Sequence, residues 1–282
     1  MDAQPDVATA NVDQQQLWNG PTGDHWAVQA DRFERMVAPF HQALMEATPV
    51  AADAYILDVG CGTGQTTRAL AGRAADGRAL GVDISRPMLS VAAARAERAG
   101  VANVEFRLAD AQVAPLGRAA FDTAVSQFGG MFFADPVAAY ANLHRAVRPG
   151  GSLGLLVWRA VQENQWMMEL IRSLAGPRPL PKRAPGTPGP FAFAEPDRIT
   201  RTLDDAGWRD VTLTPLDAET VVGGDAAEAL DMGLGLGEWL LDGADDGERA
   251  TAVDRLRSRY RELVGPGGVV VAGAAWLVTA QA

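Results

Sequence analysis

The sequence predicts an α/β protein with a doubly wound, mainly parallel sheet. Short apolar strand segments alternate with helical segments between residues 55 and 158, which is the pattern of repeated βαβ units. The first strand runs directly into a glycine-rich turn, and acidic residues stand at the ends of three successive strands. Because right-handed crossovers place the carboxyl ends of parallel strands at one edge, these acids are expected to lie together where doubly wound folds bind ligands.

Each element of this sheet has a signal in the sequence. Residues up to about Gln16 are expected to be flexible, and apolar residues at helical intervals from Leu17 to Thr48 predict two helices before the sheet. Asp135-Pro136 is typical of a helix start, and that helix is expected to end near Val147. The five predicted parallel strands lie near residues 55–59, 79–82, 104–108, 121–126 and 152–158.

The second half of the chain is expected to complete the sheet. Seven prolines between Gly176 and Pro196 exclude a regular helix or a central strand, so an ordered loop or lid is expected there. The elements predicted after it are a helix from Asp197 to Ala206, a strand from Val211 to Leu216, a helical segment over 226–264 and a last strand from Val269 to Thr279. The expected parts of the chain are a helical lid over 1–50, a ligand-binding core over 51–160 and a completing part over 161–282.

The turn from Gly60 to Gly64 is predicted to form the floor of a ligand pocket. Its glycines permit a sharp turn and a close approach of a ligand to the backbone. Asp58, just before the turn, favours a cation or an ammonium group and disfavours a phosphate. A dinucleotide fingerprint spaces its glycines as G-x-G-x-x-G, whereas Gln65 occupies the sixth position here. A turn of this kind also occurs without a ligand, so it needs support from other residues.

Acids at the ends of the next two strands give that support. Asp83 stands where doubly wound folds place a carboxylate that accepts hydrogen bonds from ribose hydroxyls. Asp110 follows the third strand and is expected to accept a hydrogen bond from the exocyclic amine of adenine. Either residue alone equally suits an exposed turn or a helix cap. Three such acids on one sheet edge indicate a nucleotide-type cofactor.

These motifs together resemble those of class I S-adenosylmethionine-dependent methyltransferases. The resemblance covers roughly residues 50 to 160 and rests on Leu57–Gly64, Gly81–Ser85 with Met88 and Leu89, Ala109–Ala111 and Arg148–Gly151. The family implies a Rossmann-like sheet of seven strands, six parallel and the last antiparallel. It also implies that a helical insert between strands six and seven, here residues 226–264, caps a substrate pocket.

The resemblance implies S-adenosylmethionine as the cofactor. The glycines are expected to border its methionine part, Asp83 to bind ribose, and Asp110 with Ala111 to meet adenine, which packs on Ile84 and Met88. Trp18 is expected either to cover the sulfonium by cation–π attraction or to belong to a helix core. The full set of predicted cofactor-binding residues is Asp58, Gly60, Gly62, Gly64, Asp83, Ile84, Met88, Asp110, Ala111, Ser126 and Trp18.

The acceptor is expected to lie beyond the cofactor, against apolar side chains that follow the fourth strand. Their character favours an aromatic or lipidic small molecule. The predicted acceptor-binding residues are Trp26, Phe128, Met131 and Phe132. His25 is the candidate general base, with a surface or capping role as its alternative, whereas His41 and His144 are expected to be structural. The chain also resembles a bacterial subgroup that is often encoded beside small-molecule biosynthesis genes. This similarity lies in Ser126–Gly129, Met131–Pro136, Pro188–Phe191 and Ala275–Ala280.

Several reactions of the family are disfavoured by missing motifs. Enzymes of the family that methylate amino groups of nucleic acids carry a Pro-Pro-aromatic motif after the fourth strand, where this chain has Ser126-Gln127-Phe128-Gly129. Methylation of cytosine at carbon needs a catalytic cysteine outside the glycine turn, and Cys61 in that turn is the only cysteine. Protein arginine methylation would need paired glutamates after the fourth strand, and no glutamate lies between Gly129 and Val147. A metal-dependent catechol enzyme would need clustered acidic ligands, and Asp135 alone makes such a site doubtful, so no metal is predicted. The expected reaction is therefore methylation of a small apolar acceptor in secondary metabolism. Oxygen is the preferred methylated atom, and carbon and nitrogen are the alternatives. The alternatives are a cofactor-binding relative that catalyses another reaction such as cyclisation or is inactive, and a nicotinamide-dependent oxidoreductase, which the glycine spacing disfavours.

Composition narrows the partners and the compartment. The chain has 282 residues, 48% of them hydrophobic, and a net charge of −10, which disfavours nucleic acid and anionic membranes. The segment Met1–Asp6 lacks the apolar stretch of a signal peptide, and a single cysteine suits a reducing compartment. We therefore expect a cytoplasmic protein without a membrane partner, and a homodimer is compatible with the sequence.

Overall fold

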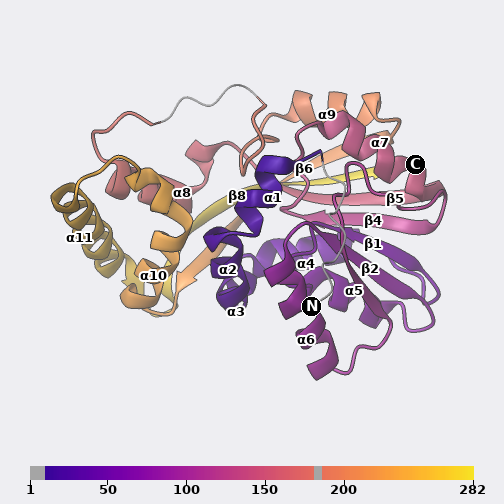
Figure 1. The fold of residues 1–282 in the computed structure, drawn as a ribbon, viewed down its shortest axis with the longest axis horizontal. Helices are drawn as coiled ribbons and strands as arrows, with labels where there is room; N and C mark the ends of the chain where they lie inside the picture. The colour runs from indigo at the N-terminus through magenta and orange to yellow at the C-terminus, as the bar shows by residue number, and fades with distance from the viewer. Residues whose placement is uncertain (1–9, 181–185) are drawn as a thin grey trace, which may run out of the picture.

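The computed structural model describes residues 10–180 and 186–282, and the predictions made for residues 1–9 and 181–185 lie outside this part of the chain. A twisted sheet carries helices on both faces, and two long strands reach beyond it toward a second group of helices (Figure 1). The strands are β1 (Tyr55–Val59), β2 (Arg78–Asp83), β3 (Val104–Leu108), β4 (Phe121–Gln127), β5 (Val147–Trp158), β6 (Arg209–Gly223), β7 (Val264–Gly265) and β8 (Gly268–Gln281).

The strand order places the ligand edge at a defined point. The sheet runs β3-β2-β1-β4-β5-β8-β6, with β7 paired to β8 outside this path. Neighbours from β3 to β5 are parallel, and β8 is antiparallel to both β5 and β6. The predicted seven-stranded sheet with an antiparallel last strand is confirmed. Because the chain winds outward from β1 to β3 and then returns to β4, the switch point lies between β1 and β4, where doubly wound sheets bind ligands.

Strand β6 is much longer than the six residues predicted from Val211 to Leu216. It pairs with β8 along its length, and only the half of β8 from Ala275 onward also pairs with β5. The remaining halves of β6 and β8 form a two-stranded arm that leaves the sheet (Figure 1). The sequence analysis predicted the inner part of β6 and missed its extension from Asp217 to Gly223, where Asp217 and Glu219 interrupt the apolar pattern.

The region before the sheet contains four short helices, where two were predicted. Pro21 stands in the first turn of the second helix and Pro39 in the first turn of the fourth. Since a proline tolerates the first turn of a helix but not its interior, each residue divides a longer helical pattern. The helices are α1 (Val12–Trp18), α2 (Pro21–Val28), α3 (Ala30–Met36) and α4 (Ala38–Ala47).

The other helices cover the sheet or form the cap. Those on the sheet are α5 (Gln65–Arg73), α6 (Arg86–Arg98), α7 (Pro136–Ala146) and α9 (Pro196–Asp205). Those at the end of the arm are α8 (Gln165–Leu170), continued by a π-helical turn (Ile171–Ala175), then α10 (Ala226–Gly237) and α11 (Asp246–Leu263). Asp225 and Asp245 cap the last two helices by accepting backbone N–H bonds. None of the helices in residues 10–180 and 186–282 is long and apolar enough to cross a membrane.

The loop before α9 is irregular where it is described, as the prolines predicted. The backbone N–H of Gly189 donates to the carbonyl of Met131 at 3.2 Å, and Trp276 Nε1 donates to the carbonyl of Ala194 at 2.9 Å. These bonds hold residues 186–194 against the sheet. The described part of the loop therefore has a fixed place beside the residues that follow β4.

Candidate functional site

A cavity of about 1500 Å³ opens at the carboxyl ends of β1, β2, β4 and β5. Its walls come from α1, α2 and α3 on one side, and from the loop after β4, the loop before α9 and helix α10 on the other. Pockets for a single drug-sized ligand measure roughly 300–1,000 Å³. The cavity therefore has room for a cofactor together with a second small molecule.

The glycine turn forms the floor of this cavity and could not be built from other residues. Gly60 and Gly62 have φ values of 66° and 53°, in the left-handed region that favours glycine. A Cβ atom on Gly60 would lie 2.9 Å from the Cα of Gly129, in the loop after β4. The backbone N–H groups of Gly60 and Cys61 donate to the carbonyl of Val82, which ties the turn to β2. The turn is thus held against both neighbouring strand ends.

Asp58, the last but one residue of β1, points a carboxylate into the base of the cavity. Its side chain is buried, and its Oδ2 accepts a hydrogen bond from Thr67 Oγ1 at 2.6 Å. Its Oδ1 has no hydrogen-bond partner among the described residues. Burial raises the pKa of this carboxyl to about 7, and the neighbouring Asp83 adds to the rise. A cationic ligand group would satisfy the open oxygen and favour the ionised form.

Asp83 is held rigidly at the end of β2. Its Oδ2 accepts the backbone N–H of Gly62 at 2.8 Å, and its Oδ1 accepts that of Ser85 at 2.8 Å. Burial raises the pKa of Asp83, and these hydrogen bonds act in the opposite direction. Each carboxylate oxygen can accept a further bond, so the pair of oxygens can still receive two ribose hydroxyls.

Asp110 is contacted by the N-terminal segment of the chain. Its Oδ1 accepts hydrogen bonds from Asn11 Nδ2 at 2.8 Å and from the N–H of Gln112 at 2.9 Å. Asn11 Oδ1 in turn accepts the N–H of Ala134 at 2.6 Å. The region predicted to be flexible up to Gln16 is therefore ordered from the start of its described part, and it covers the expected adenine position. Sequence reasoning missed Asn11 because its partners lie 99 and 123 residues away.

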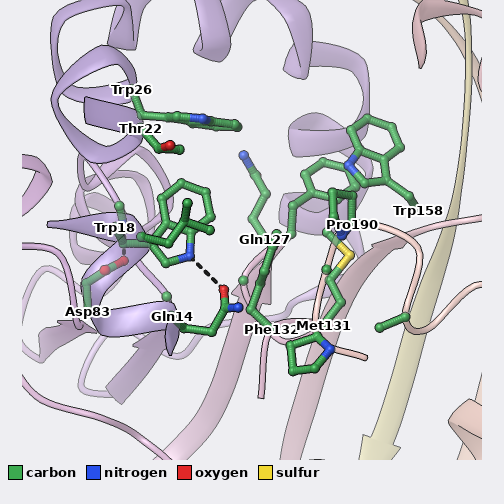
Figure 2. Close-up of a pocket in the computed structure, with 18 of the residues that line it drawn as sticks. Gln14, Trp18, Thr22, Trp26, Asp83, Gln127, Met131, Phe132, Trp158 and Pro190 are labelled. Atoms are coloured by element: carbon green, nitrogen blue, oxygen red, sulfur yellow. Dashed lines mark hydrogen bonds between the residues drawn. The ribbon is translucent and has the colours of Figure 1, made fainter. Parts of the chain in front are cut away.

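Two aromatic walls face each other across the rest of the cavity (Figure 2). On one side Trp18 contacts Trp26 edge to face, and Trp26 stacks on Phe33 with ring centroids 3.5 Å apart. On the other side Phe128 stacks on Trp158 at 4.0 Å. Further aromatic contacts extend this second wall to the loop before α9 through Trp166 and Phe191.

Ion pairs fix the N-terminal helices between the sheet and the cap. Arg32 of α3 pairs with Glu228 at 2.9 Å and with Asp231 at 2.6 Å, both on α10. On its other side α3 contacts α6, where Arg95 pairs with Glu34 and Asp31. Individual exposed pairs contribute little, but this set joins α3 to both α10 and α6.

Most of the predicted site residues line this one cavity. They are Trp18, His25, Trp26, Asp58, Gly60, Gly62, Asp83, Ile84, Met88, Asp110, Ala111, Phe128, Met131 and Phe132. The lining residues that sequence reasoning missed include Asn11, Gln14, Gln65, Gln127, Trp158 and Trp166. The buried aromatic members of this second set look in sequence like ordinary core residues of a strand or a helix.

Two predicted cofactor residues, Gly64 and Ser126, do not line the cavity. Gly64 starts α5 with a φ of 78°, and a Cβ there would lie 2.9 Å from the Phe106 ring. Ser126 is buried, and its Oγ donates to the carbonyl of Val59 at 2.7 Å. Both residues shape the ends of the strands, so the structure places them behind the site rather than in it.

The three histidines lie in different places relative to the cavity. His25 lines the cavity, where its Nε2 is buried without a hydrogen-bond partner among the described residues and faces Gly235 of α10. Burial lowers the pKa of its imidazole. His41 Nδ1 lies 2.7 Å from Gln127 Oε1, and His144 packs on Trp208, both outside the cavity lining. In the described ranges no three His, Cys, Asp or Glu side chains gather in a metal-binding group.

This sheet order, with a glycine turn at the switch point and acids at three strand ends, is the arrangement that the resemblance to class I S-adenosylmethionine-dependent methyltransferases implied. Residues 56–151 match the Methyltransferase domain family. The matched residues contain the glycine turn and the three strand-end acids that line the cavity.

Curated relatives support the same class over part of their length. The chain is 40% identical to a demethylmenaquinone methyltransferase of Thermus thermophilus over 101 residues, which are 36% of this chain and 46% of that protein. It is 35% identical to an O-methyltransferase of Penicillium expansum over 138 residues, 48% of this chain and 47% of that protein. The chain thus spans less than half the length of each relative.

Solved structures with the same fold cover nearly all of the chain. A phosphoethanolamine N-methyltransferase of Haemonchus contortus, solved with S-adenosylmethionine, covers 98% of this chain and 60% of its own, with a TM-score of 0.59 and 16% identity. The [4+2]-cyclase SpnF covers 99% of both chains, with a TM-score of 0.61 and 19% identity. At these identities the likeness concerns the fold alone.

Proposed function

We propose that the protein transfers a methyl group from S-adenosylmethionine to a small, largely apolar acceptor, preferentially at oxygen, in secondary metabolism. The observation that carries the proposal is the single cavity in which an acidic pocket at the strand ends continues into a lobe between two aromatic walls. The names of the relatives, an O-methyltransferase and a quinone-type methyltransferase, support a small acceptor.

The residues around the acidic pocket fit the cofactor chemically. The open oxygen of Asp58 suits the ammonium group of the methionine part, and the backbone at Gly60 leaves space for it. Asp83 suits the ribose hydroxyls. Asp110 suits the adenine amine, which would share Asp110 with Asn11 or replace Asn11 as the hydrogen-bond donor. When bound, S-adenosylmethionine supplies a methyl group on a sulfonium that a nucleophile can attack.

What the chain contributes is position and the exclusion of water. Trp18 and Trp26 close the cavity from the side of the N-terminal helices, and Phe128 and Trp158 bound it from the side of the sheet. An acceptor held between these walls would meet the methyl group in a fixed orientation and with little water near it. Positioning of this kind supplies much of the rate enhancement in bimolecular transfers.

The test uses S-adenosylmethionine labelled in its methyl group and a panel of phenols, naphthols, hydroquinones and enols. Label is expected in an organic product, together with S-adenosylhomocysteine. Tight cofactor binding without transfer to any acceptor would favour the non-transferring alternative, for which the similarity to the fold of SpnF is the reason. Binding of NAD without binding of S-adenosylhomocysteine would favour the oxidoreductase instead.

His25 is proposed as the general base for an acidic acceptor hydroxyl. Because burial lowers its pKa, the imidazole is neutral at physiological pH and able to accept a proton. We expect His25→Gln to lower kcat about 100-fold, in line with the loss of a general base, and to leave the Kd of S-adenosylhomocysteine within about twofold. The pH–rate profile should lose its acidic limb in this variant.

His144→Gln is the matched control, since His144 lies outside the cavity lining. Gly235→Ala is a second variant, because its new Cβ would lie 1.9 Å from His25 Nε2 and would displace the ring. It should therefore share the loss of kcat. Unchanged turnover in His25→Gln would show that this histidine only packs between α2 and α10.

A further inference from the structure

A second charged feature of the cavity lies far along the chain from the cofactor residues, on α9. Arg198 and Arg201 of this helix both line the cavity. Arg198 is half-buried, and its Nε is buried without a hydrogen-bond partner among the described residues. Arg201 is exposed and donates Nε to the carbonyl of Asp197 in its own helix at 3.1 Å. Within residues 10–180 and 186–282 neither guanidinium makes an ion pair.

The Arg198 head group has a defined position. It lies over the ring of the buried Phe193, 5.7 Å from the centroid. On its other side a Cβ added to Gly186 would lie 2.7 Å from Arg198 Nη1. Helix α9 itself is anchored by Ile199 and Leu203, which are buried in the core. The guanidinium is therefore held at the cavity wall, with little freedom to turn toward solvent.

The charges around the cavity make this arginine unusual. The acids that fit the cofactor are all at the strand ends, and the protein as a whole carries a charge of −10. Glu195 and Glu238 also line the cavity, but neither pairs with Arg198, and Glu238 contacts Arg249 instead. Removing a cation from water without a partner costs free energy, so such a group is commonly completed by an anion. No carboxylate of residues 10–180 and 186–282 pairs with this guanidinium, so the position is open to an anion from a ligand.

We propose that Arg198, supported by Arg201, binds a carboxylate on the methyl acceptor, while the apolar body of that acceptor lies between the aromatic walls. This inference rests on the proposed function and adds the charge class of the acceptor. A planar guanidinium matches a carboxylate through two parallel hydrogen bonds, and a single negative charge matches the half-buried Arg198. A neutral apolar acceptor would leave Arg198 without a partner.

The test compares 6-hydroxy-2-naphthoate with its methyl ester, in which one added methyl group removes the charge. Their naphthol fluorescence is titrated with the full-length protein loaded with S-adenosylhomocysteine. We expect the wild type to bind the acid at least tenfold more tightly than the ester. Arg198→Gln should weaken binding of the acid about tenfold and change binding of the ester by less than twofold. Arg198→Lys, which keeps the charge, should restore part of the preference.

Arg118→Gln is the matched control, because it removes the same charge from an exposed arginine outside the cavity lining. S-adenosylhomocysteine is titrated first into every variant, which reports that the fold and the cofactor site are intact. The inference would be overturned if the acid did not bind, if the ester bound as tightly, or if Arg198→Gln affected both probes alike or neither. These outcomes concern binding alone, so they are distinct from a failure of methyl transfer.

Discussion

Replacing Asp83 by alanine is expected to weaken the binding of S-adenosylhomocysteine by about 1.5–3 kcal/mol, or roughly ten- to hundredfold in Kd. The carboxylate sits at the end of β2, where it can accept hydrogen bonds from two ribose hydroxyls. Those bonds are charge-assisted and sheltered from water, which makes them stronger than bonds between neutral groups. Isothermal titration calorimetry of the variant and the wild type measures the change.

The same substitution has a second expected effect, on the free protein. Asp83 accepts the N–H groups of Gly62 and Ser85, so alanine leaves both donors without their partner. We expect the free energy of unfolding to fall by about 1–2 kcal/mol, with the fold retained. Asp76→Ala, which removes an exposed acid outside the cavity lining, is the control. Failure of Asp83→Ala to fold would make Asp83 a structural residue first, and an unchanged Kd would exclude it from the cofactor site.

The second large effect concerns Asp58 and pH. Burial raises the pKa of this carboxyl to about 7 in the folded protein, against 3.8 for the ordinary group. Between about pH 4 and pH 7 the folded state therefore binds more protons than the unfolded state, and the free energy of unfolding falls as the pH rises. A pKa shift of this size lowers the free energy of unfolding by about 4 kcal/mol between pH 4 and pH 7. The full decrease is reached above pH 7.

Cofactor binding should show the opposite trend. A ligand ammonium group favours the ionised Asp58, so binding below pH 7 must first remove a proton from the carboxyl. We expect the affinity for S-adenosylhomocysteine to rise about tenfold between pH 6 and pH 8. Calorimetry in two buffers of different ionisation enthalpy would detect the released proton.

Asp58→Asn separates this effect from other titrations. The amide keeps an oxygen for Thr67 and cannot ionise, so both pH dependences should flatten. Unfolding of Asp58→Asn at pH 8 should require at least as much denaturant as unfolding of the wild type, while its cofactor affinity is lower. Asp83, whose pKa is also raised, and His25 and His41, whose pKa values are lowered, are other shifted groups near the site, and they remain in the variant. An unchanged slope in Asp58→Asn would assign the pH dependence to them.

The part of the site that sequence could predict is the part that is local in the chain. Gly60 and Gly62 lie within a few residues of Asp58, and each strand-end acid follows its own strand. Parallel topology then brings Asp58, Asp83 and Asp110 to one edge without further information. Strand periodicity and the glycine turn together sufficed for the cofactor half of the cavity.

The acceptor half depends on contacts between distant elements. Trp158 ends β5 and looks like any apolar strand residue until its ring stacks on Phe128. Asn11 is placed by its bonds to Asp110 and Ala134, and the role proposed for Arg198 rests on its position in the folded cavity wall. The length of β6 was missed for a similar reason, since its outer half pairs with the distant strand β8 and buries Thr220 and Val222 only in the folded protein.

The central claim is that one cavity holds both S-adenosylmethionine and the acceptor, and a crystal structure with S-adenosylhomocysteine and 6-hydroxy-2-naphthoate tests it most directly. We expect the ammonium group at Asp58, the ribose at Asp83 and the adenine beside Asp110. We also expect the naphthalene ring between the aromatic walls, with its carboxylate at Arg198. An S-adenosylhomocysteine molecule bound elsewhere, or one whose sulfur faces away from Phe128, would contradict the account.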